Sequence, residues 1–298
     1  MKQLRALVLG IVFFVLLQVT VQFAAASILK NTFKIGSRII NGKLAESHNT
    51  MHQASLRRRY SDSFYFGSGH ICGGSLISPN TILSAAHCFT DFHPTNPTYY
   101  PVSDFIVVMG NLDRYEQNNN TLVFDIKHIS FGVVPFNEST FDRDIAILFL
   151  NGSVPANHPT VQPILINRLP VKAGTICQVT GWGYTETGFA ARELITLDVP
   201  KLSTEVCQKE TYFDEGLIIE GMICAGYLEG IRDACGGDSG GPLVCNGLLS
   251  GIVSWGDGCA LPFLPGVYTD VEFYEQWIQA TVTTYGGQLE GSPTYTFL

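Results

Sequence analysis

The stretch Gly236-Gly237-Asp238-Ser239-Gly240-Gly241-Pro242 is the most informative part of this 298-residue sequence. Four glycines around one serine let the backbone approach a substrate closely and adopt angles that other residues avoid. Successive backbone N–H groups beside a nucleophile can form an oxyanion hole. An ordinary glycine-rich turn has the same composition, so the interpretation of Ser239 as a nucleophile depends on partners elsewhere in the chain.

The partners of Ser239 have to lie upstream of it. The Gly-x-Ser-x-Gly pattern also occurs in α/β-hydrolases, which place Asp and His after the serine, but no histidine follows Ser239 here. Among the seven histidines before it, His87 follows the apolar run Thr81–Leu83 and adjoins Cys88. A side chain held beside a disulfide is held rigidly, as a catalytic base must be.

A carboxylate is also needed, because a buried acid fixes the tautomer and the orientation of a catalytic histidine. Asp142-Arg143-Asp144 precedes the apolar run Ile145–Leu148. An acid at this point is either a solvated cap or a buried orienting group. These residues alone leave Asp142 and Asp144 both open for the role.

Short apolar runs separated by turn residues predict a β-rich fold. The runs are bounded by Gly, Pro and Asn, and the chain has 30 glycines and 14 prolines, which favours strands in a barrel or a sandwich. They cover residues 75–77, 105–109, 145–150, 176–180, 248–253 and 266–269. One helix is predicted near the end, with Asp270 as N-cap, an apolar face and two terminating glycines. The face comprises Phe273, Trp277, Ile278 and Val282, and the terminating residues are Gly286 and Gly287.

The first 26 residues predict a signal peptide, because Lys2 and Arg5 precede an apolar run over residues 7–17 and three alanines follow at 24–26. A membrane anchor is the alternative, since the apolar stretch extends to about 20 residues, but polar residues interrupt its second half. We therefore expect a secreted, extracellular protein without a stable membrane anchor.

Charge and cysteine content agree with export. The net charge is −8; the first 38 residues hold five basic residues and no acid, so the remainder has 13 basic and 26 acidic residues. An acidic surface repels phosphate, which makes nucleic acid a poor partner. All eight cysteines lie between Cys72 and Cys259 without a Cys-x-x-Cys pair, which favours disulfides over a metal site. Sequons at Asn119, Asn137 and Asn151 are compatible with glycosylation.

Three motifs resemble the triad signatures of the chymotrypsin/trypsin family of serine proteases, in the family's order. They are Ser84-Ala85-Ala86-His87-Cys88, Asp144-Ile145-Ala146-Ile147-Leu148 and Gly237-Asp238-Ser239-Gly240-Gly241-Pro242. The similarity continues in Cys72-Gly73-Gly74-Ser75-Leu76-Ile77, Gly181-Trp182-Gly183, Ser254-Trp255-Gly256 and Pro265-Gly266-Val267-Tyr268. The resemblance covers residues 39–285. It implies an all-β fold of two six-stranded antiparallel β-barrels, with the active site in the cleft between them, in addition to the predicted C-terminal helix.

The resemblance also implies roles. Ser239 is expected to be the nucleophile, His87 the general base and then acid, and Asp144 the orienting carboxylate. The N–H groups of Gly237 and Ser239 are expected to form the oxyanion hole. The implied substrate-binding residues are Ser254, Trp255 and Gly256, which pair with the substrate backbone, with Ser254 also bonding Asp144. No cofactor or metal is expected; Asn111 occupies a position that carries an acid in the family's calcium loop.

The residue matching the base of the family's specificity pocket is Asp233, six residues before Ser239. In trypsin-like members this acid pairs with a substrate Arg or Lys. Gly256 and Gly266 match the walls of the pocket and leave room for a long side chain. Ala234 replaces a serine common beside this acid, which removes a hydroxyl that could solvate an ammonium and so favours Arg over Lys.

The implied disulfides use all eight cysteines: Cys72–Cys88, Cys177–Cys245, Cys207–Cys224 and Cys235–Cys259. The fourth is expected to brace the specificity pocket.

Arg38-Ile39-Ile40-Asn41-Gly42 resembles the family's activation site. Residues 27–38 are then an activation propeptide, residues 39–285 the protease domain and residues 286–298 a C-terminal tail. Cleavage after Arg38 by an activating protease would free the amino group of Ile39 to pair with Asp238. The expected partners are proteins cut after Arg or Lys and protein inhibitors.

A catalytically inactive, protease-like binding protein is the alternative function. It would show the loss of a triad residue, a filled oxyanion loop or a broken activation site, and the sequence contains none of these. The run Arg57-Arg58-Arg59 suggests an exosite or a self-cleavage point, but a charge run of this kind is more often a solvated loop.

Overall fold

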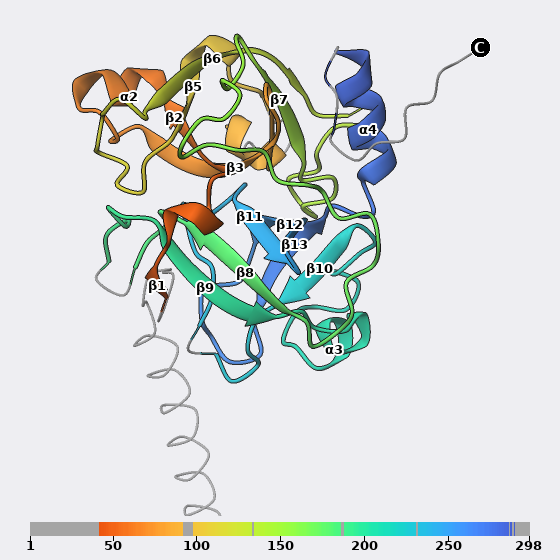
Figure 1. Cartoon of the computed structure of the whole chain (residues 1–298). Helices are drawn as coiled ribbons and strands as arrows, with labels where there is room; N and C mark the ends of the chain where they lie inside the picture. The colour runs from red at the N-terminus through yellow and green to blue at the C-terminus, as the bar shows by residue number, and fades with distance from the viewer. Residues whose placement is uncertain are drawn as a thin grey trace, which may run out of the picture. The chain divides into compact units, whose positions relative to one another are not determined.

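The computed structural model describes residues 42–285 apart from 92–97, 133, 186–187 and 231, together with residues 287 and 289. The first half of the described chain forms a closed, antiparallel, six-stranded barrel in the order β2-β3-β4-β7-β6-β5 (Figure 1). Its strands are β2 (Gln53–Arg58), β3 (His70–Ser78), β4 (Thr81–Ser84), β5 (Phe105–Met109), β6 (Leu122–Ser130) and β7 (Ala146–Leu150).

The second half forms a seven-stranded antiparallel sheet in the order β1-β9-β8-β11-β12-β13-β10. The strands are β1 (Lys43–Leu44), β8 (Ile176–Gly181), β9 (Ile195–Pro200), β10 (Met222–Ala225), β11 (Pro242–Cys245), β12 (Leu248–Trp255) and β13 (Gly266–Asp270). The N–H of Leu202 donates to the carbonyl of Cys224 at 2.9 Å, so the chain leaving β9 joins β10. The six strands without β1 therefore close on themselves, and the predicted pair of six-stranded barrels is confirmed, with β1 as an additional edge strand.

The apolar runs of the sequence became strands because both faces of these segments are covered. Every residue of β5 and of β7 is buried, and these strands read as uninterrupted apolar runs. Strand β6 instead alternates between less exposed and fully exposed positions over residues 122–127, as expected where one face meets solvent. Two separate clusters of buried side chains fill the two barrels.

The C-terminal helix is α4 (Glu275–Thr284), and its N-cap is Tyr274 rather than Asp270. The prediction for Asp270 was wrong because this residue is the last of β13, where its carboxylate accepts the N–H of Glu272 at 3.1 Å. Ile278 and Val282 are fully buried and belong to the core of the first barrel. The helix thus follows the second barrel in sequence but packs beside β7 of the first (Figure 1), which ties the two halves together.

The remaining helical segments are short. They are α2 (Arg59–Phe64), α3 (Thr204–Lys209) and the 3-10 turns η1 (Ser47–Asn49), η2 (Ala86–Phe89) and η3 (Val102–Asp104). In α3, Ser203 is the N-cap and accepts the N–H of Val206, as is usual for serine at this position.

The arginine run at residues 57–59 is not a solvated loop. Arg57 and Arg58 end β2, and Arg59 begins α2. Arg57 is only 2% exposed and forms an ion pair with Asp62 at 3.3 Å. The charge pattern was misleading because Asp62, five residues later, folds back over the turn and supplies a buried counter-charge.

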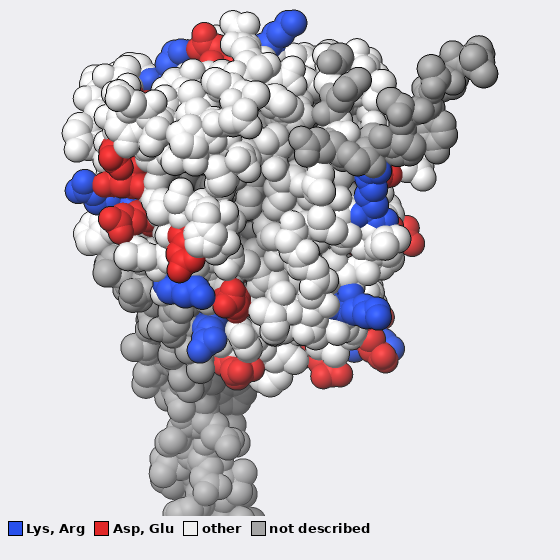
Figure 2. Space-filling model, in the orientation of Figure 1, with Lys and Arg blue, Asp and Glu red and all other residues white. Residues whose placement is uncertain are grey.

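No helix in the described part of the chain is long and apolar enough to cross a bilayer. On the face drawn in Figure 2, acidic and basic side chains are interspersed around the margin and the centre is largely uncharged. This face therefore has no continuous acidic patch, although the net charge of the protein is negative.

Candidate active site

A histidine and a carboxylate from the first barrel meet at its border with the second. Asp144 is 1% exposed and its Oδ2 lies 2.8 Å from Nδ1 of His87, while its Oδ1 accepts the backbone N–H of His87 at 2.9 Å. The two bonds fix both the position of η2 and the orientation of the imidazole. With Asp144 ionised, Nδ1 carries the proton and Nε2 is left as the basic nitrogen.

Residues of the second barrel complete the hydrogen bonds of Asp144. The hydroxyl of Ser254, in β12, donates to Oδ2 of Asp144 at 2.5 Å. The hydroxyl of Thr269, in β13, donates to the backbone carbonyl of Asp144 at 2.7 Å. A buried carboxylate is costly unless it is hydrogen-bonded, and here both of its oxygens are.

The structure distinguishes the two acids that the sequence left open. Asp142 pairs with the adjacent Arg143 at 2.5 Å and is part-exposed, so it is the solvated acid. Asp144 is the acid that faces His87. The chain between them turns sharply at Arg143, which has a φ of 59°.

The loop around Ser239 folds in the way that its glycines permit. Gly237 and Gly240 have φ angles of 93° and 76°, values that are strained for other residues. A Cβ on Gly240 would also lie 2.7 Å from the carbonyl oxygen of Gly73. In this conformation, no backbone or side-chain acceptor among the described residues takes the N–H groups of Gly237 and Ser239. Two backbone donors are therefore available, one on the half-buried Ser239 and one two residues before it.

The carboxylate of Asp238 lies inside this loop. It is fully buried and accepts the N–H of Gly183 at 2.9 Å and that of Cys235 at 2.8 Å. Gly181 and Gly183 make room for it, since a Cβ on Gly183 would come within 2.6 Å of its Cγ. Burial raises the pKa of Asp238 to about 7, an effect that the two N–H donors partly oppose. This carboxylate is thus poised to gain from a cationic partner.

Ser239 and His87 line one cavity of about 290 Å³, and Asp233 also lines it. Asp233 is 2% exposed; its Oδ2 accepts the N–H of Ala260 at 3.2 Å, and its Oδ1 has no aligned hydrogen-bond donor among the described residues. Burial raises the pKa of this carboxyl to about 7, with a smaller contribution from the charge of Asp238. An unsatisfied, buried carboxylate facing a cavity favours a cationic ligand.

The predicted wall residues also line this cavity: Ser254, Trp255, Gly256 and Gly266. A Cβ on Gly266 would lie 2.9 Å from Oδ1 of Asp233, so a larger residue there would cover the acid. On Gly256 a Cβ would meet only the carbonyl oxygen of Gly258, at 3.4 Å. The cavity is accordingly open along this wall.

Sequence reasoning assigned no role to two aromatic residues that line the cavity. Tyr268 is fully buried, and its hydroxyl has no hydrogen-bond partner in the described part of the chain; its motif was noted, but not its place beside Asp233. The ring of Phe141 lies 6.0 Å from that of His87 and 6.1 Å from that of Trp255. The sequence offered one sign of this position for Phe141, because it is an aromatic residue in a polar loop three residues before Asp144.

His70 was also missed. Its Nδ1 lies 2.9 Å from the hydroxyl of Ser55 and its Nε2 lies 3.1 Å from the carbonyl of Gly237. Burial lowers the pKa of His70 to about 3, so the ring is neutral at physiological pH. It supports the loop of Ser239 from the first barrel.

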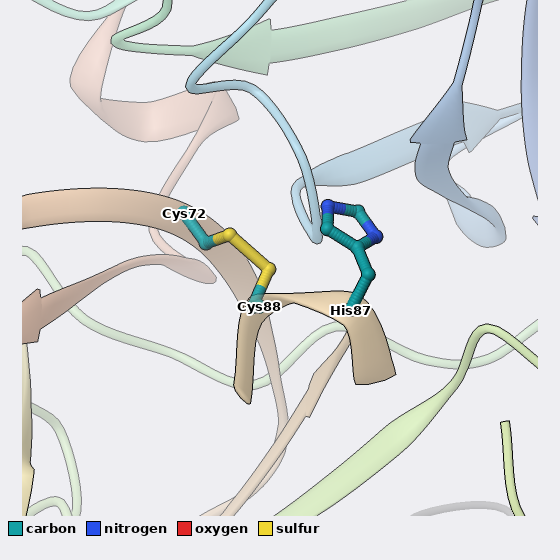
Figure 3. A group of neighbouring side chains, drawn as sticks. All are labelled: Cys72, His87 and Cys88. Atoms are coloured by element: carbon teal, nitrogen blue, oxygen red, sulfur yellow. A yellow bond between two sulfur atoms is a disulfide. The ribbon is translucent and has the colours of Figure 1, made fainter. Parts of the chain in front are cut away.

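Three of the four implied disulfides are formed: Cys72–Cys88, Cys177–Cys245 and Cys207–Cys224. Cys235 and Cys259 lie side by side, with Sγ atoms 2.6 Å apart, and their disulfide stays a prediction. Cys72, His87 and Cys88 cluster as metal ligands might be arranged, but the two sulfur atoms are joined to each other and offer no thiolate (Figure 3). The cluster is a disulfide that braces the histidine.

The activation residues Arg38 and Ile39 lie outside the described residues, as do the signal peptide, the propeptide and most of the tail.

Comparisons with known proteins agree with this geometry. The model of the Trypsin family matches residues 39–278. Trypsin II-P29 of Gallus gallus is 39% identical over 254 residues, which covers 83% of this chain and 90% of that protein. Trypsin eta of Drosophila melanogaster is 38% identical over 250 residues, which covers 83% of this chain and 90% of that protein. Trypsin V-B of Rattus norvegicus is 39% identical over 246 residues, with coverage of 82% and 89%. The chain belongs to the trypsin family and is a trypsin-like serine endopeptidase.

Proposed function

We propose that this protease cleaves peptide bonds after Arg or Lys through a Ser-His-Asp acyl-enzyme mechanism. The observation that carries the proposal is Asp233. Its carboxylate is buried in the cavity that Ser239 and His87 line, and one of its oxygens lacks an aligned donor. A guanidinium or ammonium would supply the missing donors and the counter-charge together.

In the proposed acylation, Nε2 of His87 takes the proton of Ser239 as Oγ attacks the carbonyl carbon of the substrate. The resulting oxyanion accepts the N–H groups of Gly237 and Ser239. When the C–N bond breaks, His87 passes the proton to the leaving amine. Water then attacks the ester by the same route, with His87 first as base and then as acid. Asp144 holds the imidazole and stabilises its positive charge throughout.

The choice between Arg and Lys follows from Ala234. Lys presents a compact, strongly hydrated ammonium with three donors, whereas Arg presents a planar fork of five donors that pairs with a carboxylate in a bidentate manner. A serine at position 234 would add a hydroxyl acceptor for the ammonium. Alanine adds none, so we expect Arg to be preferred.

The same proposal includes secretion and activation by cleavage. Residues 1–26 have the charged, apolar and small-residue segments of a signal peptide. Arg38 directly precedes Ile39, and among the described residues the buried carboxylate of Asp238 is bonded only by backbone N–H groups. A new ammonium at Ile39 would be a suitable counter-ion for it. Without this ion, the loop that carries Ser239 would hold an uncompensated buried charge.

Profiling of the Arg38-cleaved protein with a peptide library tests the proposal. We expect cleavage after Arg and, more slowly, after Lys. The matched control is Ser239→Ala, which retains the fold but should lose turnover by several orders of magnitude, because only binding and oxyanion stabilisation remain. Cleavage after apolar residues would refute the assignment of Asp233. Near-normal turnover by Ser239→Ala would refute the assignment of the nucleophile.

A further inference from the structure

Three asparagines have the sequence pattern and the exposure that attachment of an N-linked oligosaccharide requires. Each stands two residues before a serine or a threonine, with no proline between them, which is the acceptor pattern. Each is also exposed in the folded chain, as a bulky, hydrophilic group needs. The three residues are Asn119, Asn137 and Asn151, and their places in the fold decide what a glycan on each would do.

Two of these asparagines lie at the end of the first barrel that is remote from the active site. Strand β7 begins two residues after Asp144 and ends just before Asn151, so the strand separates them by roughly 20 Å at about 3.4 Å per residue. Strand β6 runs antiparallel to β7, with its last residue, Ser130, beside the start of β7. Asn119 precedes the first residue of β6 and therefore lies toward the same remote end as Asn151.

Asn137 instead lies at the edge of the active-site cavity. Its N–H donates at 3.0 Å to the carbonyl of Asp142, within the loop that leads to the catalytic acid. The preceding residue, Phe136, is 3% exposed, and its ring lies 5.7 Å from that of Phe141. Phe141 lines the cavity, and its ring lies 6.0 Å from that of His87. A group attached to Asn137 would therefore stand beside the entrance to the cavity.

The loop holds Asn137 in place and leaves its attachment atom free. Oδ1 of Asn137 accepts the backbone N–H of Ser139 at 3.0 Å, which closes a tight turn. Nδ2 forms no hydrogen bond within the described part of the chain. The buried ring of Phe136 anchors the backbone on one side, and the bond to Asp142 anchors it on the other. Attachment at Nδ2 would keep the turn intact, because Oδ1 remains an acceptor.

We propose that Asn137 carries an N-linked glycan, which limits the access of large folded proteins to the cavity and leaves it open to short peptides. This inference rests on the proposed function, because secretion brings the chain to the oligosaccharide donor. That donor is a lipid-linked oligosaccharide pyrophosphate. Nδ2 forms a bond to C1 of the first sugar while the bond from C1 to the pyrophosphate oxygen breaks. The pyrophosphate leaves with the electron pair, and the amide loses one proton.

The size of the substrate determines how strongly the glycan opposes binding. A short, extended peptide needs only the cavity and the strand segment Ser254–Gly256. A folded protein presents a broad surface, about 800 Å² per partner in a typical complex, and this surface has to extend over the loop of Phe141 and Asn137. It would displace or confine the glycan, and confinement costs conformational entropy. Large substrates and protein inhibitors should both be disfavoured.

The decisive variant is Ser139→Ala, produced as the full chain in a eukaryotic cell line that secretes it. The substitution removes the hydroxyl that the acceptor pattern requires, but it keeps the backbone N–H that bonds Oδ1 of Asn137. The loop therefore retains its turn and loses only the glycan. Ser139→Thr is the matched control, since it preserves the acceptor pattern. Asn119→Gln and Asn151→Gln remove glycans at the remote end of the barrel.

The first measurement is a peptide map of the secreted protein after enzymatic deglycosylation in heavy-oxygen water, which should show labelled Asp at position 137. The second compares kcat/KM on one arginine-containing sequence, used as a free peptide and as a surface loop of a folded carrier protein. In the Arg38-cleaved protein, Ser139→Ala should raise kcat/KM on the carrier about tenfold and change that on the free peptide by less than about twofold. Ser139→Thr, Asn119→Gln and Asn151→Gln should match the parent protein.

An unlabelled Asn137 in the peptide map overturns the proposal. So does a carrier-to-peptide ratio that Ser139→Ala leaves unchanged, or one that Asn119→Gln and Asn151→Gln raise equally, since the effect would then not depend on the position beside the cavity. If the cleaved protein does not hydrolyse the free peptide, the proposed function is contradicted, and the peptide map still decides whether Asn137 carries a glycan.

Discussion

Ser254 donates a 2.5 Å hydrogen bond to Asp144 across 110 residues of sequence. The acid precedes β7 of the first barrel, and the hydroxyl belongs to β12 of the second. The carboxylate that orients His87 is therefore positioned by both barrels at once. Any relative movement of the barrels would disturb the hydrogen bond between Asp144 and His87. The geometry of the site therefore depends on how the two barrels pack against each other.

Asp144→Asn should lower kcat by about four orders of magnitude, because an amide can favour the wrong imidazole tautomer. Ser254→Ala should have a smaller effect, about tenfold, since Asp144 keeps both of its bonds to His87. The rates are measured with an arginine amide substrate after cleavage at Arg38. An equal loss in the two variants would contradict the view that Ser254 only supports the acid.

Asp233→Ser should abolish the preference for basic side chains, because a buried cation would then lack its counter-charge. Matched peptides with Arg or Leu at the cleaved position are compared on the parent protein and on the variant by kcat/KM. The variant should approach equal rates for the two peptides. If the Arg-to-Leu ratio does not change, Asp233 is not the residue that reads the substrate.

Binding of benzamidine, a cationic ligand, should strengthen between pH 6 and pH 8. Burial raises the pKa of Asp233 to about 7 in the free protein, and a cation favours the ionised carboxylate, which lowers that pKa on binding. Affinity should thus fall about tenfold per pH unit below the pKa. Calorimetry in two buffers should show proton release near pH 7. Asp233→Ser should lose this release, and proton uptake in the parent protein would contradict the argument.

Arg38→Gln should yield a folded, secreted and inactive chain. The backbone amide at Ile39 is uncharged and cannot compensate Asp238, whose burial is complete. Replacing residues before Ile39 with an enteropeptidase-type site, and then cleaving there, should restore activity on arginine substrates. An uncleaved chain as active as the cleaved one would show that Arg38 is only an exposed basic residue.

The activated protein should also lose activity as the pH rises into the alkaline range. An unperturbed α-amino group has a pKa of about 7.7–8.0, and pairing with Asp238 should raise it in the folded state. With Asp238 ionised, the contribution of the amino group to the ion pair is fully present below its unperturbed pKa and is lost as the pH rises through the folded one. Acetylation of the new amino group at Ile39 should abolish the activity at every pH, and retained activity would exclude the ion pair.

Asp62→Asn should lower the free energy of unfolding by about 3 kcal/mol, because it leaves the buried charge of Arg57 uncompensated. The side chains of this pair are only 3% and 5% exposed. Asp125→Asn is the matched control: its pair with Arg59 is 46% and 59% exposed and should contribute at most ~1 kcal/mol. Urea unfolding measures both, and equal effects would show that the Arg57–Asp62 pair does not anchor the turn after β2.

Local sequence patterns determined much of the fold. The uninterrupted apolar runs of β5 and β7 predicted buried strands, since a strand covered on both faces needs apolar side chains at every position. The C-terminal helix was predicted from its 3.6-residue period, although its start was placed too early. Asp270 has the chemistry of an N-cap, but pairing with β12 keeps it in an extended strand.

The conformation of the segment around Ser239 could also be predicted from the sequence. Glycines at 237 and 240 were required by positive φ angles, which are local properties of the chain. The absence of a histidine after Ser239 excluded the order found in α/β-hydrolases. Family resemblance then connected Ser239 with His87 and Asp144, a connection that composition and spacing alone did not supply.

Burial and long-range contacts decided the roles of several charged residues, and only the tertiary structure shows these. Asp142 and Asp144 are equivalent as sequence, and they differ because one faces Arg143 and solvent while the other faces His87 and Ser254. Arg57 belongs to a charge run, yet it is buried against Asp62. The charge of a residue is written in the sequence, but its desolvation and its partners depend on segments that folding brings together. For that reason, only the folded chain shows that burial raises the pKa of Asp233.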